Sequence, residues 1–237
     1  MTAPPGGRVP AGALDLHAVA DGAPFDASYY VDHYRDYAAQ NPRHKLAFYR
    51  AMIEAHCGPR RPLRLLDVGC GLGSFLEHMS GVPGWDLSGC DVNADAIRAV
   101  RKRLPGVALA EAPATAEPFP AASFDVVTAL DVVEHVPDTR AVARAVESQL
   151  RPGGLFVLVV PVYDGPTGPV IRLLDRDPTH LHKWGRDAWL TWMAERFDVL
   201  DWRGMIRYLL PGGVYLHVTT RRLRRATSAI LVVGRKR

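Results

Sequence analysis

The chain is 237 residues long, with 48% hydrophobic and 23% charged residues and a formal net charge of +4. These values are typical of a globular protein in water, and the length suits one α/β domain with a modest appendage. The composition argues against a membrane-spanning protein, because no apolar run reaches the ~18–20 residues that a span needs.

The cysteines and the first residues bear on the compartment. Cys57, Cys70 and Cys90 are odd in number and lack the spacing of metal ligands. The opening residues also lack the apolar core of a secretory signal. We therefore expect a reducing, cytoplasmic setting.

The N-terminal quarter divides into two predicted parts. Residues 1–24 are rich in Pro, Gly and Ala and predict a flexible arm. Residues 25–58 predict two helices, one from Asp26 and a second that begins near Pro42 and ends at Gly58.

A glycine-rich turn follows the first predicted strand. Residues 63–75 read LRLLDVGCGLGSF, an apolar run that ends in Asp67, then Gly69, Gly71 and Gly73, then a helix start. This order is typical of a nucleotide-type site at a helix N-terminus. The spacing is G-x-G-x-G rather than the dinucleotide G-x-G-x-x-G. Because the Asp67 carboxylate would repel a diphosphate and attract an ammonium group, the turn favours S-adenosylmethionine over a dinucleotide.

A second acid supports a nucleoside ligand. Asp91 ends the next apolar stretch, 22 positions after Gly69. An acid at that place in such folds accepts hydrogen bonds from ribose hydroxyls.

The rest of the chain predicts alternating helices and strands, with no internal repeat. Residues 161–187 are expected to be irregular and to leave the carboxyl end of a parallel strand, where ligands of such sheets bind. The predicted strands are 85–91, 107–109, 124–130, 155–160, 197–202 and 228–233, and an insert occupies 203–226.

Four sequence blocks in order carry a family resemblance: LLDVGCGLGSFL (65–76), GCDVN (89–93), PFPAASFDVVTALDVVEHVPD (118–138) and LRPGGLFVLVVP (150–161). Together they resemble the class I S-adenosylmethionine-dependent methyltransferases. The resemblance implies a Rossmann-like α/β fold in residues 59–237. Its mostly parallel seven-stranded sheet would have an antiparallel last strand, helices on both faces and an N-terminal helical lid, residues 25–58, over the substrate. Four side chains of this lid would line the acceptor pocket, with packing onto the domain as the alternative: Tyr29, Tyr30, His33 and Tyr34.

The resemblance also implies a cofactor site. Its residues would be Asp67, Gly69, Cys70, Gly71, Gly73, Asp91, Val92, Ala114, Leu130, Asp131 and His44. Arg43, His44 or Lys45 would neutralise the cofactor carboxylate, and His44 is our choice. Cys70 is expected to pack beneath the ligand. At the family's adenine-binding acid this chain has Pro113, and Glu111 is the nearest acid.

A second resemblance concerns the acceptor. The string DPTHLHKW (177–184) is similar to a stretch of the ubiquinone-pathway O-methyltransferases. It implies that His180 and His182 take the acceptor proton or bind the acceptor, and Tyr163 is assigned to the same pocket. His135 is expected to orient its loop, with catalysis as the alternative. Because Asp175 or Asp177 with the two histidines lacks further ligands, no metal is predicted.

These features predict methyl transfer to a small molecule, most often on oxygen, in metabolite or secondary-metabolite biosynthesis. From Trp202 onward there are nine Lys and Arg and no Asp or Glu, so an RNA or protein methyltransferase is the alternative. A non-catalytic cofactor-binding regulator is a third hypothesis, and a nucleotide-dependent oxidoreductase is remote. We expect no nucleic-acid partner and no membrane span, and leave homodimerisation open.

Overall fold

The computed structural model describes residues 37–175, 177–210 and 214–237. The predicted arm (1–24), most of the first lid helix and the pocket candidates Tyr29, Tyr30, His33 and Tyr34 lie outside these ranges.

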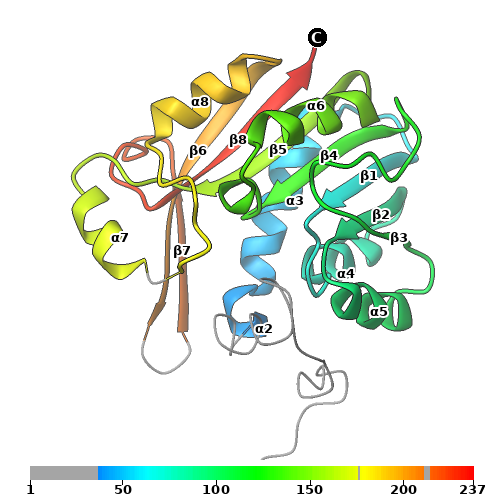
Figure 1. The fold of residues 1–237 in the computed structure, drawn as a ribbon, viewed down its shortest axis with the longest axis horizontal. Coiled ribbons are helices and arrows are strands. Elements are labelled where there is room, and N and C mark those ends of the chain that lie inside the picture. Colours follow the sequence, from blue (N-terminus) through cyan, green and yellow to red (C-terminus); the bar gives the residue numbers. More distant parts are fainter. Residues whose placement is uncertain (1–36, 176, 211–213) are drawn as a thin grey trace, which may run out of the picture.

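One mixed sheet forms the centre of the described chain (Figure 1). Its strand order is β3-β2-β1-β4-β5-β8-β6-β7. The bounds are β1 (Leu63–Val68), β2 (Trp85–Asp91), β3 (Ala108–Glu111), β4 (Phe124–Leu130), β5 (Leu150–Pro161), β6 (Phe197–Leu210), β7 (Val214–Thr220) and β8 (Ala229–Lys236). The first five strands pair in parallel, and β8 lies antiparallel between β5 and β6. The predicted parallel sheet with an antiparallel C-terminal strand is thus confirmed.

The predicted number of seven strands is wrong, since the described sheet has eight. β6 does not stop at Trp202 but continues to Leu210 and pairs antiparallel with β7. Much of the segment predicted as an insert, residues 203–226, is therefore a hairpin on the sheet edge. Figure 1 shows this hairpin reaching past the other strands, beside the start of α3 (Arg43–Cys57).

Helices cover both faces of the sheet. One apolar layer packs α3, α4 (Ser74–Ser80) and α5 (Ala94–Arg103) against it, and the other packs α6 (Thr139–Gln149) and α8 (Arg186–Ala194). The remaining helical elements are α2 (Tyr37–Gln40), α7 (Gly168–Leu174) and the 3-10 turn η2 (Val133–His135). α7 adds one short helix to residues 161–187, a segment for which no helix was predicted.

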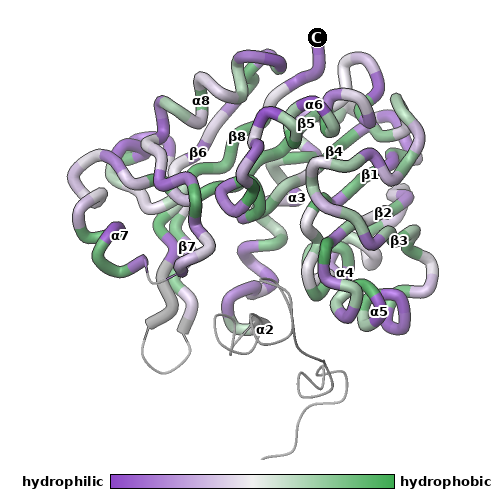
Figure 2. Tube along the Cα trace, in the orientation of Figure 1, coloured by the Kyte–Doolittle hydropathy of each residue, from purple (hydrophilic) through white to green (hydrophobic). Residues whose placement is uncertain are grey.

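The central strands are apolar over most of their length, as the tube in Figure 2 shows, because both of their faces are covered. In β4, Val126 faces the α3 layer and Val127 faces the α6 layer, and in β8 Leu231 and Val232 divide in the same way. This period of two lets one buried strand contribute to both layers.

The ends of α3 follow the sequence. Pro42 precedes the first helical residue, where its missing N–H costs nothing, and Gly58 ends the helix with a φ of 68°. Of the helices in the described ranges, not one has the length and apolar character needed to cross a bilayer.

Candidate functional site

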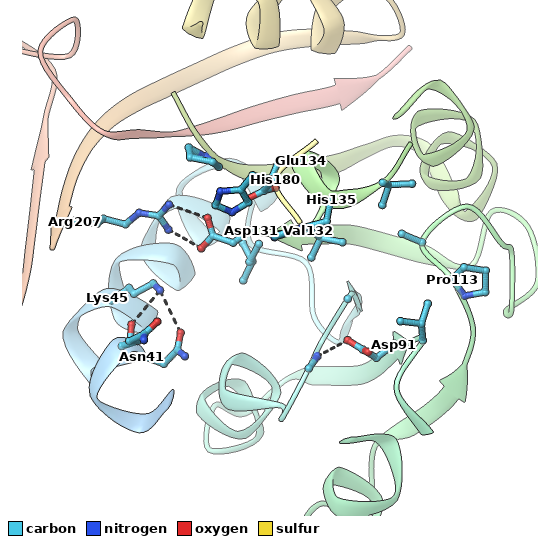
Figure 3. Close-up of a pocket in the computed structure, with 18 of the residues that line it drawn as sticks. Asn41, Lys45, Asp91, Pro113, Asp131, Val132, Glu134, His135, His180 and Arg207 are labelled. Carbon is cyan, nitrogen blue, oxygen red and sulfur yellow. Dashed lines mark hydrogen bonds and ion pairs between the residues drawn. The ribbon is translucent and has the colours of Figure 1, made fainter. Parts of the chain in front are cut away.

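A cavity of about 480 Å³ lies beyond the carboxyl ends of the parallel strands (Figure 3). The chain leaves β1, β2, β3 and β4 there, and α3, β6 and β7 add side chains from the other side. Ligands of open α/β sheets bind at this edge, and a cavity of ~300–1,000 Å³ suits a small organic molecule.

The glycine turn after β1 forms one wall. Gly69 has a φ of 67°, and a Cβ there would overlap the side chain of Val132. Glycine is therefore required both by the backbone angle and by the close approach of the loop after β4.

Asp91 holds the turn in place from the end of β2. Its carboxylate accepts the N–H of Gly71 at 2.8 Å, the dashed line at Asp91 in Figure 3. It also accepts the N–H of Asn93 at 2.9 Å. Burial raises the pKa of Asp91, although the two backbone donors oppose this. A carboxylate has about four lone-pair sites, so Asp91 retains acceptor capacity for hydroxyl groups of a ligand.

Asp131 and Arg207 form a partly buried ion pair at the cavity. Arg207 donates to both carboxylate oxygens at 2.5 and 2.8 Å, as the paired dashed lines in Figure 3 show. Asp131 has a φ of 60°, a strained conformation for a residue other than glycine. Burial acts to raise the pKa of Asp131, but Arg207, with Lys45 and His180 beyond it, holds that pKa below its usual value.

Lys45 supplies a second cation. It is 6% exposed, and its Nζ donates to the Gln40 carbonyl at 3.1 Å and to Asn41 Oδ1 at 3.2 Å. Burial lowers the pKa of Lys45 to about 8, with Asp131 opposing and Arg207 adding to the shift. An anionic group of a ligand would favour the charged form of this amine.

Two histidines lie on the wall nearest β5. The ring centroids of His135 and His180 are 4.7 Å apart. His180 Nδ1 lies 2.9 Å from Asp175 Oδ1 and 3.0 Å from the Tyr163 hydroxyl, which donates to the other Asp175 oxygen. The carboxylate thus orients the His180 ring.

The cavity brings together nine of the predicted site residues: Gly69, Gly71, Asp91, Val92, Ala114, Leu130, Asp131, His135 and His180. Pro113 lines the cavity beside Ala114, whereas Glu111 does not. The segment after β3 therefore offers apolar contacts where the resemblance implied an acid.

Asp67 is not on the cavity wall. It is 3% exposed, and its carboxylate accepts the Thr128 hydroxyl at 2.6 Å. Burial raises its pKa to about 7. Cys70 and Gly73 also lie off the wall, Cys70 buried as expected and Gly73 at the start of α4. The expectation that Asp67 meets the ligand's ammonium directly is therefore wrong for this geometry.

Of the three basic candidates in α3, Arg43, His44 and Lys45, it is Lys45 that lines the cavity. The His44 ring lies 6.0 Å from the ring of His217 in β7. Lys45 is four residues before the buried Tyr49, so it shares the inward face of α3. That spacing was the signal that distinguished Lys45 from His44.

His182 and Tyr163 also lie off the cavity wall. His182 Nε2 is 2.9 Å from the Val136 carbonyl, and its ring packs on Trp184. Tyr163 is buried behind His180 and acts through Asp175. Neither residue contacts the cavity as expected from the resemblance.

Three ionisable residues on the cavity wall had no site role in the sequence predictions: Glu134, Arg207 and Tyr215. Arg207 was counted within the basic C-terminal region. No local pattern marked it, because its partner Asp131 is 76 positions away. The string VVEHV does contain Glu134 beside His135, which was a usable signal.

Comparisons with known proteins agree with this geometry. Residues 31–203 match the model of a family described as "Methyltransferase domain". The ubiquinone biosynthesis O-methyltransferase of Thiobacillus denitrificans is 40% identical over 103 residues, which are 40% of this chain and 44% of that enzyme. The chain thus aligns with less than half of that relative's length.

Solved structures share the fold. A putative methyltransferase from Bacillus halodurans is 16% identical, with a TM-score of 0.64 over 81% of this chain and 99% of that one. The geranyl diphosphate C-methyltransferase of Streptomyces coelicolor, solved with Mg²⁺, a substrate analogue and S-adenosyl-L-homocysteine, is 15% identical. Its TM-score is 0.61, covering 81% of this chain and 76% of that one. At these identities the likeness concerns the architecture alone.

Proposed function

Because the chain belongs to the methyltransferase-domain family, we propose that it transfers the methyl group of S-adenosylmethionine to an oxygen of a small-molecule acceptor. Family membership confirms the resemblance drawn from the four sequence blocks. The oxygen acceptor is suggested by the O-methyltransferase relative, of which this chain matches under half.

The residues of the cavity fit this methyl donor. Asp91 has capacity for ribose hydroxyls, and the segment around Pro113 offers apolar surface for a planar base. Lys45 suits a carboxylate, and Asp131 and the backbone near Leu130 suit an ammonium group. This spread of opposite charges along one cavity carries the proposal, because a diphosphate would meet carboxylates at both Asp91 and Asp131.

The donor carries its methyl group on a positively charged sulfur. When the methyl group is transferred, the rest of the donor leaves as a neutral thioether. The chain's own task is to hold the acceptor in line and exclude water, which contributes up to ~7–11 kcal/mol in the best cases. A hydroxyl acceptor must also lose its proton. We assign the acceptor end of the cavity, where that proton is removed, to the wall that carries His135 and His180.

The basic C-terminal region gives little support to a nucleic-acid substrate. Arg207 is inside the cavity, Arg221 is near Asp201, and Arg237 pairs with Asp198. Arg224 stacks over the ring of Trp202 at 4.3 Å. These groups are engaged in the fold, so we propose no second function.

A labelled-methyl assay tests the proposal. The chain is incubated with S-adenosylmethionine carrying a radioactive methyl group and with phenols and catechols, or with RNA and bulk protein. We expect label in the small hydroxyl compounds. His180→Ala should slow that transfer by ~10²–10⁴-fold while S-adenosylhomocysteine still binds. Label found only in RNA or protein, or full turnover by His180→Ala, would contradict this assignment.

A further inference from the structure

Glu134 is a buried carboxylate whose side chain makes no ion pair or hydrogen bond within the described part of the chain. It is 0% exposed, lines the cavity, and neither of its side-chain oxygens has a hydrogen-bond partner. An unpaired ion in such a place is costly, by several kcal/mol. Either the carboxyl is held neutral by a proton or a cation binds beside it.

The neighbours of Glu134 favour a cation. Glu134, His135 and His180 each offer one ligand atom, and these atoms lie within 4.8 Å of one another. Ligands at ~2.1 Å from a common ion are at most ~4.2 Å apart, so small side-chain rotations bring all three into range. Figure 3 shows the three side chains grouped on one wall of the cavity.

The hydrogen bonds of His180 prepare it as a ligand. Its Nδ1 lies 2.9 Å from Asp175 Oδ1, and Lys183 and the Tyr163 hydroxyl both donate to Asp175 Oδ2. The carboxylate is therefore ionised, and Nδ1 must carry the proton that it accepts. The other nitrogen, Nε2, then carries a lone pair.

The hydrogen bonds of His135 have the same effect. The Thr179 hydroxyl donates its proton to Asp177 Oδ1 at 2.5 Å. Thr179 Oγ1 can therefore only accept from His135 Nδ1, which is 2.8 Å away. Both imidazoles are thus protonated on Nδ1, an arrangement that second-shell oxygen atoms commonly impose on metal-binding histidines.

From this geometry we propose that Glu134, His135 and His180 bind a divalent transition-metal ion at the acceptor end of the cavity. Two imidazoles and one carboxylate suit zinc, cobalt or iron(II) better than magnesium, which prefers oxygen ligands. With three protein ligands, coordination positions remain open for a further ligand.

The open positions suggest a use, which rests on the proposed methyl transfer. A coordinated cation lowers the pKa of a bound hydroxyl, so that the proton leaves to solvent and the oxygen stays as an anion. His180 would then act as a metal ligand and not as a base. Asp175 is a positioning residue, since it acts through the His180 ring.

Cobalt binding tests the site without any methyl transfer. The full chain is freed of metal with a chelator and titrated with Co²⁺, whose visible absorption reports its coordination. We expect one equivalent to bind. Glu134→Gln and His180→Gln should weaken binding by ~100-fold or more, and Asp175→Asn by ~10–100-fold. His182→Gln is the matched control and should bind Co²⁺ as the parent does, because its ring contacts Val136 and Trp184 instead.

S-adenosylhomocysteine binding by each variant shows that its cavity is folded, and only folded variants are compared. No Co²⁺ uptake by the parent, or undiminished uptake by folded Glu134→Gln and His180→Gln, would overturn the proposal and leave Glu134 as a protonated acid. Failure of the labelled-methyl assay with intact Co²⁺ binding would overturn the proposed function alone.

Discussion

We expect Lys45 to make binding of the proposed cofactor depend on pH, in a direction that follows from its lowered pKa. Its pKa is lowered to about 8, chiefly by burial, so in the free protein it loses its charge within an accessible range. A ligand carboxylate binds the charged form. Affinity for S-adenosylhomocysteine should therefore fall as pH rises through about 8, because binding then requires proton uptake.

The size of the effect follows from proton linkage. At pH 7 about a tenth of the free Lys45 is neutral, and at pH 9 about nine tenths is. If the carboxylate keeps Lys45 charged in the complex, the dissociation constant should rise about tenfold between these values. A tenfold change corresponds to ~1.4 kcal/mol. This is slightly below the ~1.5–3 kcal/mol expected for a hydrogen bond to a charged group.

Titration calorimetry isolates the contribution of Lys45 to this pH dependence. It compares the parent with Lys45→Arg, and S-adenosylhomocysteine with 5′-methylthioadenosine. The arginine of Lys45→Arg stays charged over the whole pH range, so the affinity of this variant should not fall tenfold between pH 7 and pH 9. Titration of the ligand's own amino group affects both proteins equally and cancels in the comparison. 5′-Methylthioadenosine lacks the carboxylate and should bind without the Lys45 term. Parallel pH profiles for the parent and Lys45→Arg would refute the assignment of Lys45 to the carboxylate.

Three further predictions use other features of the cavity. Folding raises the pKa of Asp67 from 3.8 to about 7, so between these values the folded protein keeps a proton that the unfolded chain has released. The free energy of unfolding should therefore fall by ~3 kcal/mol as the pH rises from about 5 to 8. Urea unfolding should show this slope in the parent and not in Asp67→Asn, and equal slopes would count against it. Gly69→Ala should cost more stability than Gly153→Ala, since both have φ near 70° but only Gly69 would gain a clash; equal losses would assign the whole cost to the backbone angle. Arg207→Met should destabilise the fold by ~1.5–3 kcal/mol by leaving the partly buried Asp131 without its partner. Adding Asp131→Asn should restore part of this, and additive losses in thermal unfolding would contradict the expectation.

The parts of the site that sequence reasoning found are those set by local chemistry. The positive φ of Gly69 and the place of Asp91 at the end of β2 follow from a strand, a tight turn and a helix that are contiguous in the chain. The alternation of apolar residues in the strands likewise needs only the period of two. These features could be predicted because neighbours along the chain decide them.

The predictions that failed are those that depend on which way a side chain points. His44 and Lys45 are adjacent, but about 100° of helix rotation separates them, and only Lys45 shares a face with Tyr49. Asp67 follows Leu65 on the same face of β1 and is therefore directed beneath the glycine turn. In both cases the period of the helix or strand, counted from a buried neighbour, indicates the direction in which the side chain points.

Contacts between distant segments were beyond such reasoning, and they decide the acceptor end of the cavity. Glu134 and His135 follow β4, His180 follows β5, and Arg207 comes from the hairpin that the sequence presented as an insert. Their meeting depends on the strand order, in which β8 returns antiparallel and places β6 next to it. The proposed cofactor end is built from residues at the ends of the first strands, within or near the four sequence blocks. The acceptor end requires the whole sheet, so it is where this chain has room to differ from its relatives in substrate and in metal.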